Sequence, residues 1–137
     1  MTRGPATGTI IANPWQMTEG ELLAEILARC AGRDLWPVRV APERITQRTA
    51  ENRGFPDLQI WGPRGVILRE LKTCKGRYRV SPKQTEWKHR LCSSGQDWDI
   101  WTPLDLESGH IDDYLRWLET PGRGTDRFAL ALARRNT

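Results

Sequence analysis

The sequence predicts a mixed α/β fold in which a small sheet is flanked by helices. Three observations lead to this fold class: two strand-like segments joined by a tight turn, an amphipathic helix before them, and a helix, a strand and another amphipathic helix after them. An order in which helices and strands alternate is typical of a sheet covered by helices. The length of 137 residues suffices for one such domain but is short for two.

The first helix is predicted to begin after Thr18, a favourable N-cap, and to end at Gly32. Glu21 stands three residues after Thr18 and completes a capping box. At about 100° per residue, the apolar stripe of this helix has its centre close to the direction of Glu19. We therefore expect Glu19 to point toward the domain interior. An acidic residue in a first turn also has a purely structural use, because it complements the helix dipole.

The sheet is predicted from three apolar segments. Residues 34–40 are predicted to form a short edge strand, because Pro37 interrupts them and proline is confined to edge strands. The polar residues 41–53 indicate an exposed loop. Two longer strands are expected from Phe55 to Trp61 and from Val66 to Thr73, with the turn GPRG between them.

The second half of the chain is predicted to add a helix, a strand and a helix. Ser81 caps a helix that starts with Pro82 and stops at Gly95. Residues 98–103, WDIWTP, are the last expected strand, and residues 110–119 form the closing helix.

The composition favours a polyanionic partner. The formal net charge is +4, and residues 64–90 carry nine Lys or Arg and two acidic residues, which favours nucleic acid. No apolar run could span a membrane and no signal-peptide core is present, so we expect a cytoplasmic protein, in the host cytoplasm if a phage encodes it. The three cysteines lack the paired spacing of a zinc site or disulfide framework. We expect a flexible lead-in over residues 1–17, one domain over 18–119 and a basic tail over 120–137.

The chain contains seven tryptophans. They are expected to serve as core and interface anchors rather than as platforms for stacked bases, because their spacing follows strand and helix positions predicted to be buried. Trp61 lies at the hairpin tip, where exposure at a dimer contact is expected.

Three charged residues stand in the predicted hairpin, although strands disfavour Asp, Glu and Lys. If GPRG is a symmetric turn, Trp61 pairs with Val66 and Asp57 lies directly opposite Glu70. Lys72 follows Glu70 by two positions and shares its face of the sheet. We therefore expect Asp57, Glu70 and Lys72 to meet at one place.

Two facing carboxylates repel each other unless a positive charge lies between them, and a divalent cation with oxygen ligands meets that need. A bound metal ion can activate a water and neutralise charge on a phosphate, while a nearby lysine orients that water. The structural alternative is a solvated ion pair. The apolar neighbours of Glu70 disfavour this alternative, because a buried strand rarely holds charge without a partner or a function.

Gln84 allows two interpretations. Ser81 and Gln84 match a capping box, which is a sufficient structural reason for both residues. Yet Gln84 shares a helix face with Trp87, Lys88 and Leu91, which would direct it toward the sheet. The sequence leaves both interpretations open.

Taken together, the motifs resemble the VRR-NUC branch of the PD-(D/E)XK nuclease superfamily, in the small stand-alone form often met in phages. The resemblance rests on GFPD with Asp57, ELK from Glu70 to Lys72, KGR at 75–77, S-x-x-Q-x-x-W from Ser81 to Trp87, and WTPLD from Trp101. Glu19 fits the glutamate often seen in the first helix. The similarity covers residues 18–118, and the order of these motifs is more specific than the D…ExK signature alone.

The resemblance implies a restriction-endonuclease-like core and a phosphodiesterase that acts on DNA with Mg²⁺, for which Mn²⁺ can substitute, and with no small-molecule cofactor. The implied metal ligands are Asp57, Glu70, the backbone carbonyl of Leu71, and Glu19 directly or through water. Lys72 would position the attacking water, and Gln84 would support Lys72 or that water.

A basic rim around this site is expected to contact phosphates, although each member alone has the character of a solvated surface charge. Its predicted members are Arg44, Arg48, Arg53, Lys75, Arg77, Arg79, Lys83, Lys88 and Arg90. Relatives often carry a histidine in the loop before GFPD, and this chain has none there, so the role of that loop stays open.

We therefore expect a metal-dependent DNA endonuclease. Stand-alone members of this branch resemble Holliday-junction resolvases, and a two-stranded cut needs two active sites, so selectivity for branched DNA and a homodimer are expected. Such a short chain would select by DNA shape rather than by reading base edges. A nicking or flap-type nuclease, working as a monomer or with a partner, is one alternative. The other is a non-catalytic nucleic-acid-binding module, against which the intact Asp57, Glu70 and Lys72 argue.

Overall fold

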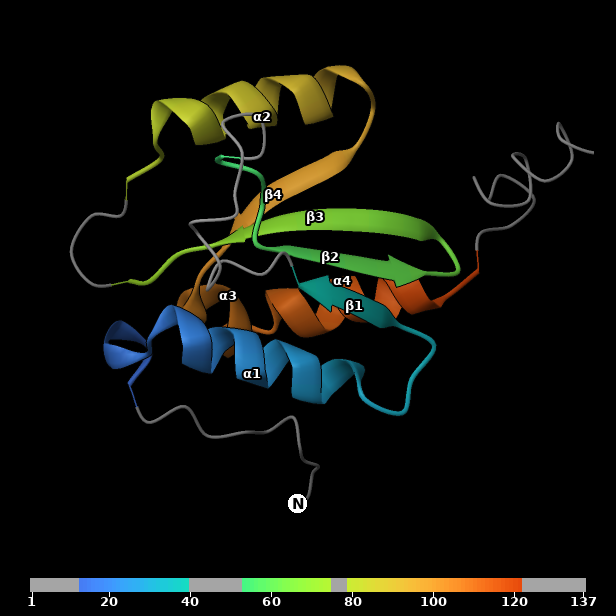
Figure 1. The fold of residues 1–137 in the computed structure, drawn as a ribbon. Helices are drawn as coiled ribbons and strands as arrows, with labels where there is room; N and C mark the ends of the chain where they lie inside the picture. Colours follow the sequence, from blue (N-terminus) through green and yellow to red (C-terminus); the bar gives the residue numbers. More distant parts are fainter. Residues whose placement is uncertain (1–12, 40–52, 75–78, 122–137) are drawn as a thin grey trace, which may run out of the picture.

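Helices cover both faces of a central β-sheet in this chain (Figure 1). A computed structural model describes residues 13–39, 53–74 and 79–121. In chain order these residues form η1 (Pro14–Gln16), α1 (Glu19–Cys30), β1 (Trp36–Arg39), β2 (Leu58–Gly62), β3 (Gly65–Leu71), α2 (Pro82–Ser93), β4 (Asp97–Trp101), α3 (Pro103–Glu107) and α4 (His110–Glu119). This is the predicted α/β order with two additions, since η1 lies in the expected flexible lead-in and α3 was not expected.

Within the described residues the strand order is β1-β2-β3-β4. β2 is antiparallel to both β1 and β3, whereas β4 is parallel to β3, because α2 carries the chain back between them. Trp61 pairs with Val66, which is the predicted hairpin register. The ladder ends at the pair of Leu58 and Arg69, so β2 begins three residues later than the predicted start at Phe55.

The core lies between the sheet and the layer formed by α1, α3 and α4, while α2 lies on the other face (Figure 1). Leu22 and Ile26 of α1, Trp101 of β4 and Leu115 of α4 are completely buried in it. Every residue of β3 from Ile67 to the end of the strand is buried, as its apolar run predicted. β3 is therefore covered on both faces.

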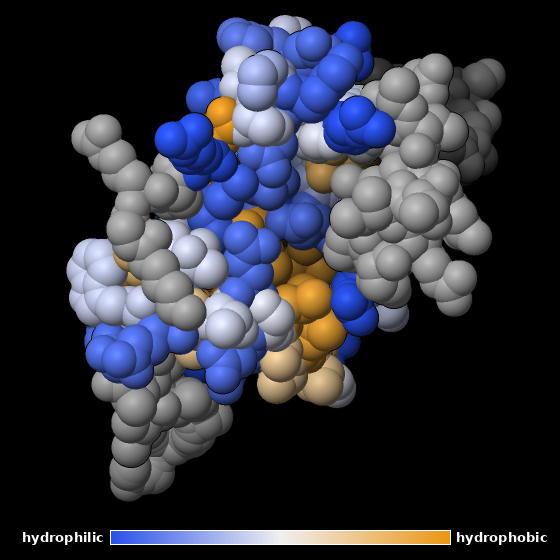
Figure 2. Space-filling view, turned by 60° about the vertical axis from the view of Figure 1, so that its left-hand side comes forward, coloured by the Kyte–Doolittle hydropathy of each residue, from blue (hydrophilic) through white to orange (hydrophobic). Residues whose placement is uncertain are grey.

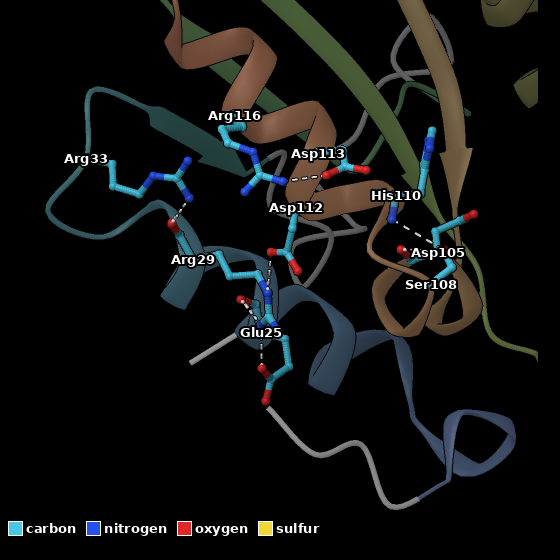
Figure 3. Close-up of polar contacts among 9 residues, drawn as sticks. All are labelled: Glu25, Arg29, Arg33, Asp105, Ser108, His110, Asp112, Asp113 and Arg116. Atoms are coloured by element: carbon cyan, nitrogen blue, oxygen red, sulfur yellow. Dashed lines mark hydrogen bonds and ion pairs between the residues drawn. The ribbon is translucent and has the colours of Figure 1, made fainter. Parts of the chain in front are cut away.

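An ion-pair network joins α1 to α4 (Figure 3). The Arg29 guanidinium contacts the Glu25 carboxylate at 2.7 Å and the Asp112 carboxylate at 2.9 Å. Farther along, Arg33 contacts Glu119 at 2.8 Å. The Arg29–Asp112 pair connects α1 to α4, and the Arg33–Glu119 pair connects the segment after α1 to the end of α4, so both contribute to the placement of α1 beside α4.

Most of the tryptophans are not core residues, although their spacing was expected to follow buried positions; the exposure expected of Trp61 is observed. Only Trp101 is completely buried, and Trp87 and Trp98 are half-buried. The exposed ones are Trp15, Trp36, Trp61 and Trp117. Strand and helix periodicity placed them on apolar faces, but Trp36 and Trp61 pair at the edge of the sheet, where these faces stay open.

Some of the sequence predictions fall on residues that the structure does not describe. The first twelve residues of the expected lead-in, most of the expected loop after β1 and nearly all of the basic tail lie outside the described ranges. Cys30, Cys74 and Cys92 are free thiols. None of the described helices is long and apolar enough to cross a membrane.

Gly54 lets the segment before β2 touch the first turn of α2. Its φ is +87°, and a Cβ added there would lie 2.5 Å from the backbone carbonyl carbon of Lys83 and 2.7 Å from the backbone nitrogen of Gln84. These atoms belong to a helix backbone and cannot rotate away. The glycine of GFPD is therefore required both by its conformation and by a close approach.

We predict that Gly54→Ala destabilises the protein more than Gly109→Ala does. Gly109 has nearly the same φ, +88°, but nothing lies within 4 Å of an added Cβ. The left-handed backbone costs about 1–2 kcal/mol in both variants, and steric overlap adds about 1–3 kcal/mol in Gly54→Ala alone. Denaturant unfolding measures the difference, and equal losses of unfolding free energy would contradict the close contact.

Candidate active site

The charged residues of the hairpin meet where β3 leaves the sheet, on the side of the molecule where α1 and α2 begin (Figure 1). β3 and β4 run parallel, so their last residues, Leu71 and Trp101, pair at the same edge. The backbone N–H of Lys72 donates to the Trp101 carbonyl at 3.0 Å, which holds Lys72 against β4 beyond the end of β3.

Asp57 stands just before β2 and is attached to β3 by its side chain. Its Oδ2 accepts a hydrogen bond from the backbone N–H of Leu71 at 3.0 Å. The observed register, continued by one residue, places Asp57 across from Glu70 as predicted. At this position the Asp57 side chain, and not a backbone carbonyl, accepts the N–H of β3. For this reason β2 begins only at Leu58.

Gln84 connects Glu70 with Lys72. Its Nε2 donates to Glu70 Oε2 at 2.7 Å, and its Oε1 accepts from Lys72 Nζ at 3.1 Å. The same Oε1 accepts from the backbone N–H of Ser81 at 3.0 Å and so completes the capping box. Both interpretations that the sequence left open are therefore correct at once. The capping box fixes the orientation in which the amide reaches the two charged groups.

Glu70 is a carboxylate in an unfavourable place, with only 4% of its surface exposed. Burial raises its pKa to about 8, and the negative charge of Asp57 contributes to the same rise. Lys72, whose Nζ lies 3.7 Å from Glu70 Oε2, opposes the rise but does not cancel it. The centre therefore has a deficit of positive charge.

Glu19 lies at the rim of this centre and not inside it. The residue is exposed, which corrects the expectation that it points into the interior. Partial desolvation and then the charge of Asp57 raise its pKa, so it lies close enough to act on the cluster. Glu21 and Thr18 form the capping box at this helix start, which leaves the Glu19 side chain available for another role.

The residues at the centre suit a hard divalent cation. Asp57 and Glu70 present carboxylate oxygens beside the backbone of Leu71, and Mg²⁺ is commonly bound by one or two carboxylates together with waters and substrate phosphates. Within the described residues, no group of three or more His, Cys, Asp or Glu side chains is arranged to hold a metal ion.

The structure describes five members of the predicted basic rim. Arg53 and Arg79 are exposed, Lys83 and Arg90 both approach Glu86, at 3.7 and 3.8 Å, and Lys88 Nζ lies 5.4 Å from the ring centroid of Trp98. Figure 2, which brings forward the side where β3 ends, shows a mainly hydrophilic surface over α2. The other predicted members, Arg44, Arg48, Lys75 and Arg77, lie outside the described residues.

Arg69 is a buried charge next to the site that sequence reasoning missed. It is completely buried, contacts the Asp97 carboxylate at 3.1 Å and lies 4.8 Å from the ring centroid of Trp101 and 4.7 Å from that of Tyr114. Strand alternation was the available signal, because a residue next to Glu70 must face the opposite side of the sheet. Its partner Asp97 could not be identified from spacing.

The similarity searches support the fold. No family model matches the sequence, and no curated protein matches it. Among solved structures, the chain is similar to one described as a "VRR_NUC domain protein", with a TM-score of 0.56 and 19% sequence identity. The match covers 77% of this chain and 93% of that one. The fold of this chain is therefore that of a VRR_NUC domain protein, as the motifs predicted.

We predict that Glu70→Gln changes how the stability of the metal-free protein depends on pH. The folded-state pKa of Glu70, about 8, exceeds the ordinary value of 4.5, so the folded protein binds more protons than the unfolded chain between these pH values. Stability must therefore fall as pH rises through this window, and the variant should lose less of it than the wild type. Thermal unfolding in chelator across this pH range measures the effect.

Glu107→Gln provides the matched control, since Glu107 is an exposed carboxylate on α3. Its pH profile should follow that of the wild type. Parallel profiles for the wild type and Glu70→Gln would contradict the buried-charge interpretation.

Proposed function

We propose that this chain is a metal-dependent nuclease of the PD-(D/E)XK type that hydrolyses phosphodiester bonds in DNA. One observation carries the proposal: Gln84 contacts Glu70 at 2.7 Å and Lys72 at 3.1 Å, beside Asp57, at the end of a buried strand. The similarity in fold to a VRR_NUC domain protein supports the same class of activity, and the net charge of +4 favours a polyanionic substrate.

Asp57, Glu70 and the backbone carbonyl of Leu71 would hold a Mg²⁺ ion, with Glu19 contributing from the rim. When bound, the cation supplies positive charge that polarises the scissile phosphate. It would also relieve the repulsion that raises the pKa of Glu70. Mn²⁺ is expected to substitute, because it accepts the same carboxylate, carbonyl and water ligands.

Lys72 would position the attacking water and stabilise the negative charge that develops on the phosphate. An ammonium group has three N–H donors, and Gln84 Oε1 accepts one, so others remain for water or phosphate oxygen. The Nε2 atom of the same amide donates a hydrogen bond to the Glu70 carboxylate. The amide would thus keep the ligand and the lysine in a constant relative position, as supporting hydrogen bonds do around metal sites.

Selectivity for branched DNA by a homodimer is the finer form of this proposal. The described part of each chain carries a single cluster of this kind, so a coordinated cut in two strands would need two copies. A monomeric nicking or flap-type nuclease is the alternative. Labelled linear, nicked, flap and four-way-junction DNA in Mg²⁺ or Mn²⁺, combined with a sizing run, distinguishes the two.

We predict that Asp57→Asn and Lys72→Ala each lower the rate of DNA cleavage in Mg²⁺ by about 10²–10⁴-fold, because each removes a group that acts on the reacting phosphate or water. Asp113→Asn, on the exposed face of α4, is the matched control and should cut at the wild-type rate. Single-turnover cleavage of labelled DNA measures these rates. A Lys72→Ala protein that cuts normally, or activity that persists in EDTA, would overturn the proposal.

We predict that Ser81→Ala and Gln84→Ala separate the cap of α2 from the active site. Both break the capping box, and the loss of the cap alone should lower the unfolding free energy by about 1 kcal/mol in each variant. Only Gln84→Ala also releases Glu70 and Lys72, so only this variant should slow cleavage at temperatures where both proteins are folded. Equal cleavage rates in the two variants would restrict Gln84 to a capping role.

A further inference from the structure

A pocket of about 550 Å³ opens beside the proposed active site, along the outer edge of β4. Its lining includes Thr73, which directly follows Lys72, and the successive residues Trp98 and Asp99. Successive strand residues point to opposite faces, so the pocket runs along the strand edge and not over one face. Its volume lies in the range of about 300–1,000 Å³ that is typical of sites for small organic groups.

The walls of this β4-edge pocket are suited to a flat aromatic group. Trp15 of η1 lines it and is 56% exposed. Trp98 lines it from β4, with the Lys88 ammonium over its ring, and Leu104 of α3 adds an exposed apolar side chain. Aromatic rings beside a basic group are the usual means of binding unpaired bases.

The charges of the pocket favour a base over a phosphate. The carboxylates of Asp99 and Asp105 belong to the lining and would repel a phosphate, whereas a carboxylate accepts hydrogen bonds from the amino groups on base edges. Asp105 Oδ2 already accepts from the backbone N–H of Thr102 at 2.8 Å, and Asp99 Oδ1 from the backbone N–H of Ile100 at 2.7 Å, but Asp99 is the more exposed of the two. Lys88 supplies a positive charge at the α2 side, where the backbone of a bound strand would pass.

We propose that the β4-edge pocket is a subsite for an unpaired nucleobase next to the scissile phosphate. This inference rests on the proposed nuclease function, and it makes DNA with a single-stranded nucleotide at the cut the preferred substrate. A base in a regular duplex is stacked and paired, and its removal into a pocket costs energy. A base that is already unpaired enters the pocket without this energy cost. Duplex DNA without an unpaired nucleotide at the cut is therefore the poorer substrate.

The test uses the full-length Glu70→Gln protein with Mg²⁺, so that binding is measured without cleavage. The probes are single-stranded oligonucleotides with 2-aminopurine at one position, and fully paired duplexes of the same sequence. We expect 2-aminopurine fluorescence to be quenched at one position of the single strand. Trp15→Ala should reduce the quenching and weaken single-strand binding about tenfold, with little effect on the paired duplex.

Trp36→Ala is the matched control, because Trp36 is 58% exposed but lies on β1, at the opposite edge of the sheet. It should leave both kinds of binding unchanged. An abasic nucleotide at the quenched position should weaken binding by the Glu70→Gln protein as much as Trp15→Ala does, which tests the site even if the Trp15→Ala variant folds poorly. Asp99→Asn should change the preference among the four bases at this position without unfolding the protein.

Equal effects of Trp15→Ala and Trp36→Ala, or full affinity for the abasic strand, would overturn the subsite. The proposed nuclease function is judged separately by wild-type cleavage in Mg²⁺. Position-specific quenching without any cleavage would support the subsite and contradict the nuclease function. Cleavage without position-specific quenching would support the nuclease function and contradict the subsite.

Discussion

The structure depends on the burial of two successive charges at the end of β3. Arg69 faces the helices of the core layer and pairs with Asp97 of β4, whereas Glu70 faces the other way and is held by Gln84 of α2. Removing Asp97 from its ion pair with the buried Arg69 would typically cost about 3–5 kcal/mol, and removing Gln84 would leave buried Glu70 without the hydrogen bond that the amide donates. β4 and α2 must therefore lie where these two partners reach β3, and the same requirement places Lys72 beside Glu70.

The candidate site is assembled from elements that are separate in the sequence. The segment before β2 brings Asp57, the end of β3 brings Glu70 and Lys72, and the first turn of α2 brings Gln84. The close approach at Gly54 connects the first of these elements to the third. The backbone N–H of Leu71 holds Asp57, the capping box holds Gln84, and Gln84 in turn holds Glu70 and Lys72, so the geometry does not depend on long, free side chains.

One edge of the sheet serves both the chemistry that we propose and the pocket beside it. Parallel pairing of β3 and β4 brings their carboxyl ends together, so Lys72 and Thr73 lie where the outer edge of β4 also opens. A strand end offers backbone groups and successive side chains on two faces within a few ångströms. A phosphodiester and its neighbouring base could therefore be bound side by side, because Thr73, which lines the pocket, directly follows Lys72.

The sequence alone determined the hairpin register, the two capping boxes and the order of elements, because turn length, strand alternation and cap spacing are local properties. That was sufficient to predict the approach of Asp57 to Glu70. Only the tertiary structure decided that Gln84 contacts Lys72 while it caps α2, that Arg69 is paired with Asp97, and that Glu19 stays at the rim. The exposure of Trp15 was decided in the same way. These features depend on which helix covers which part of the sheet, and that results from packing between segments distant in the chain, which no local pattern encodes.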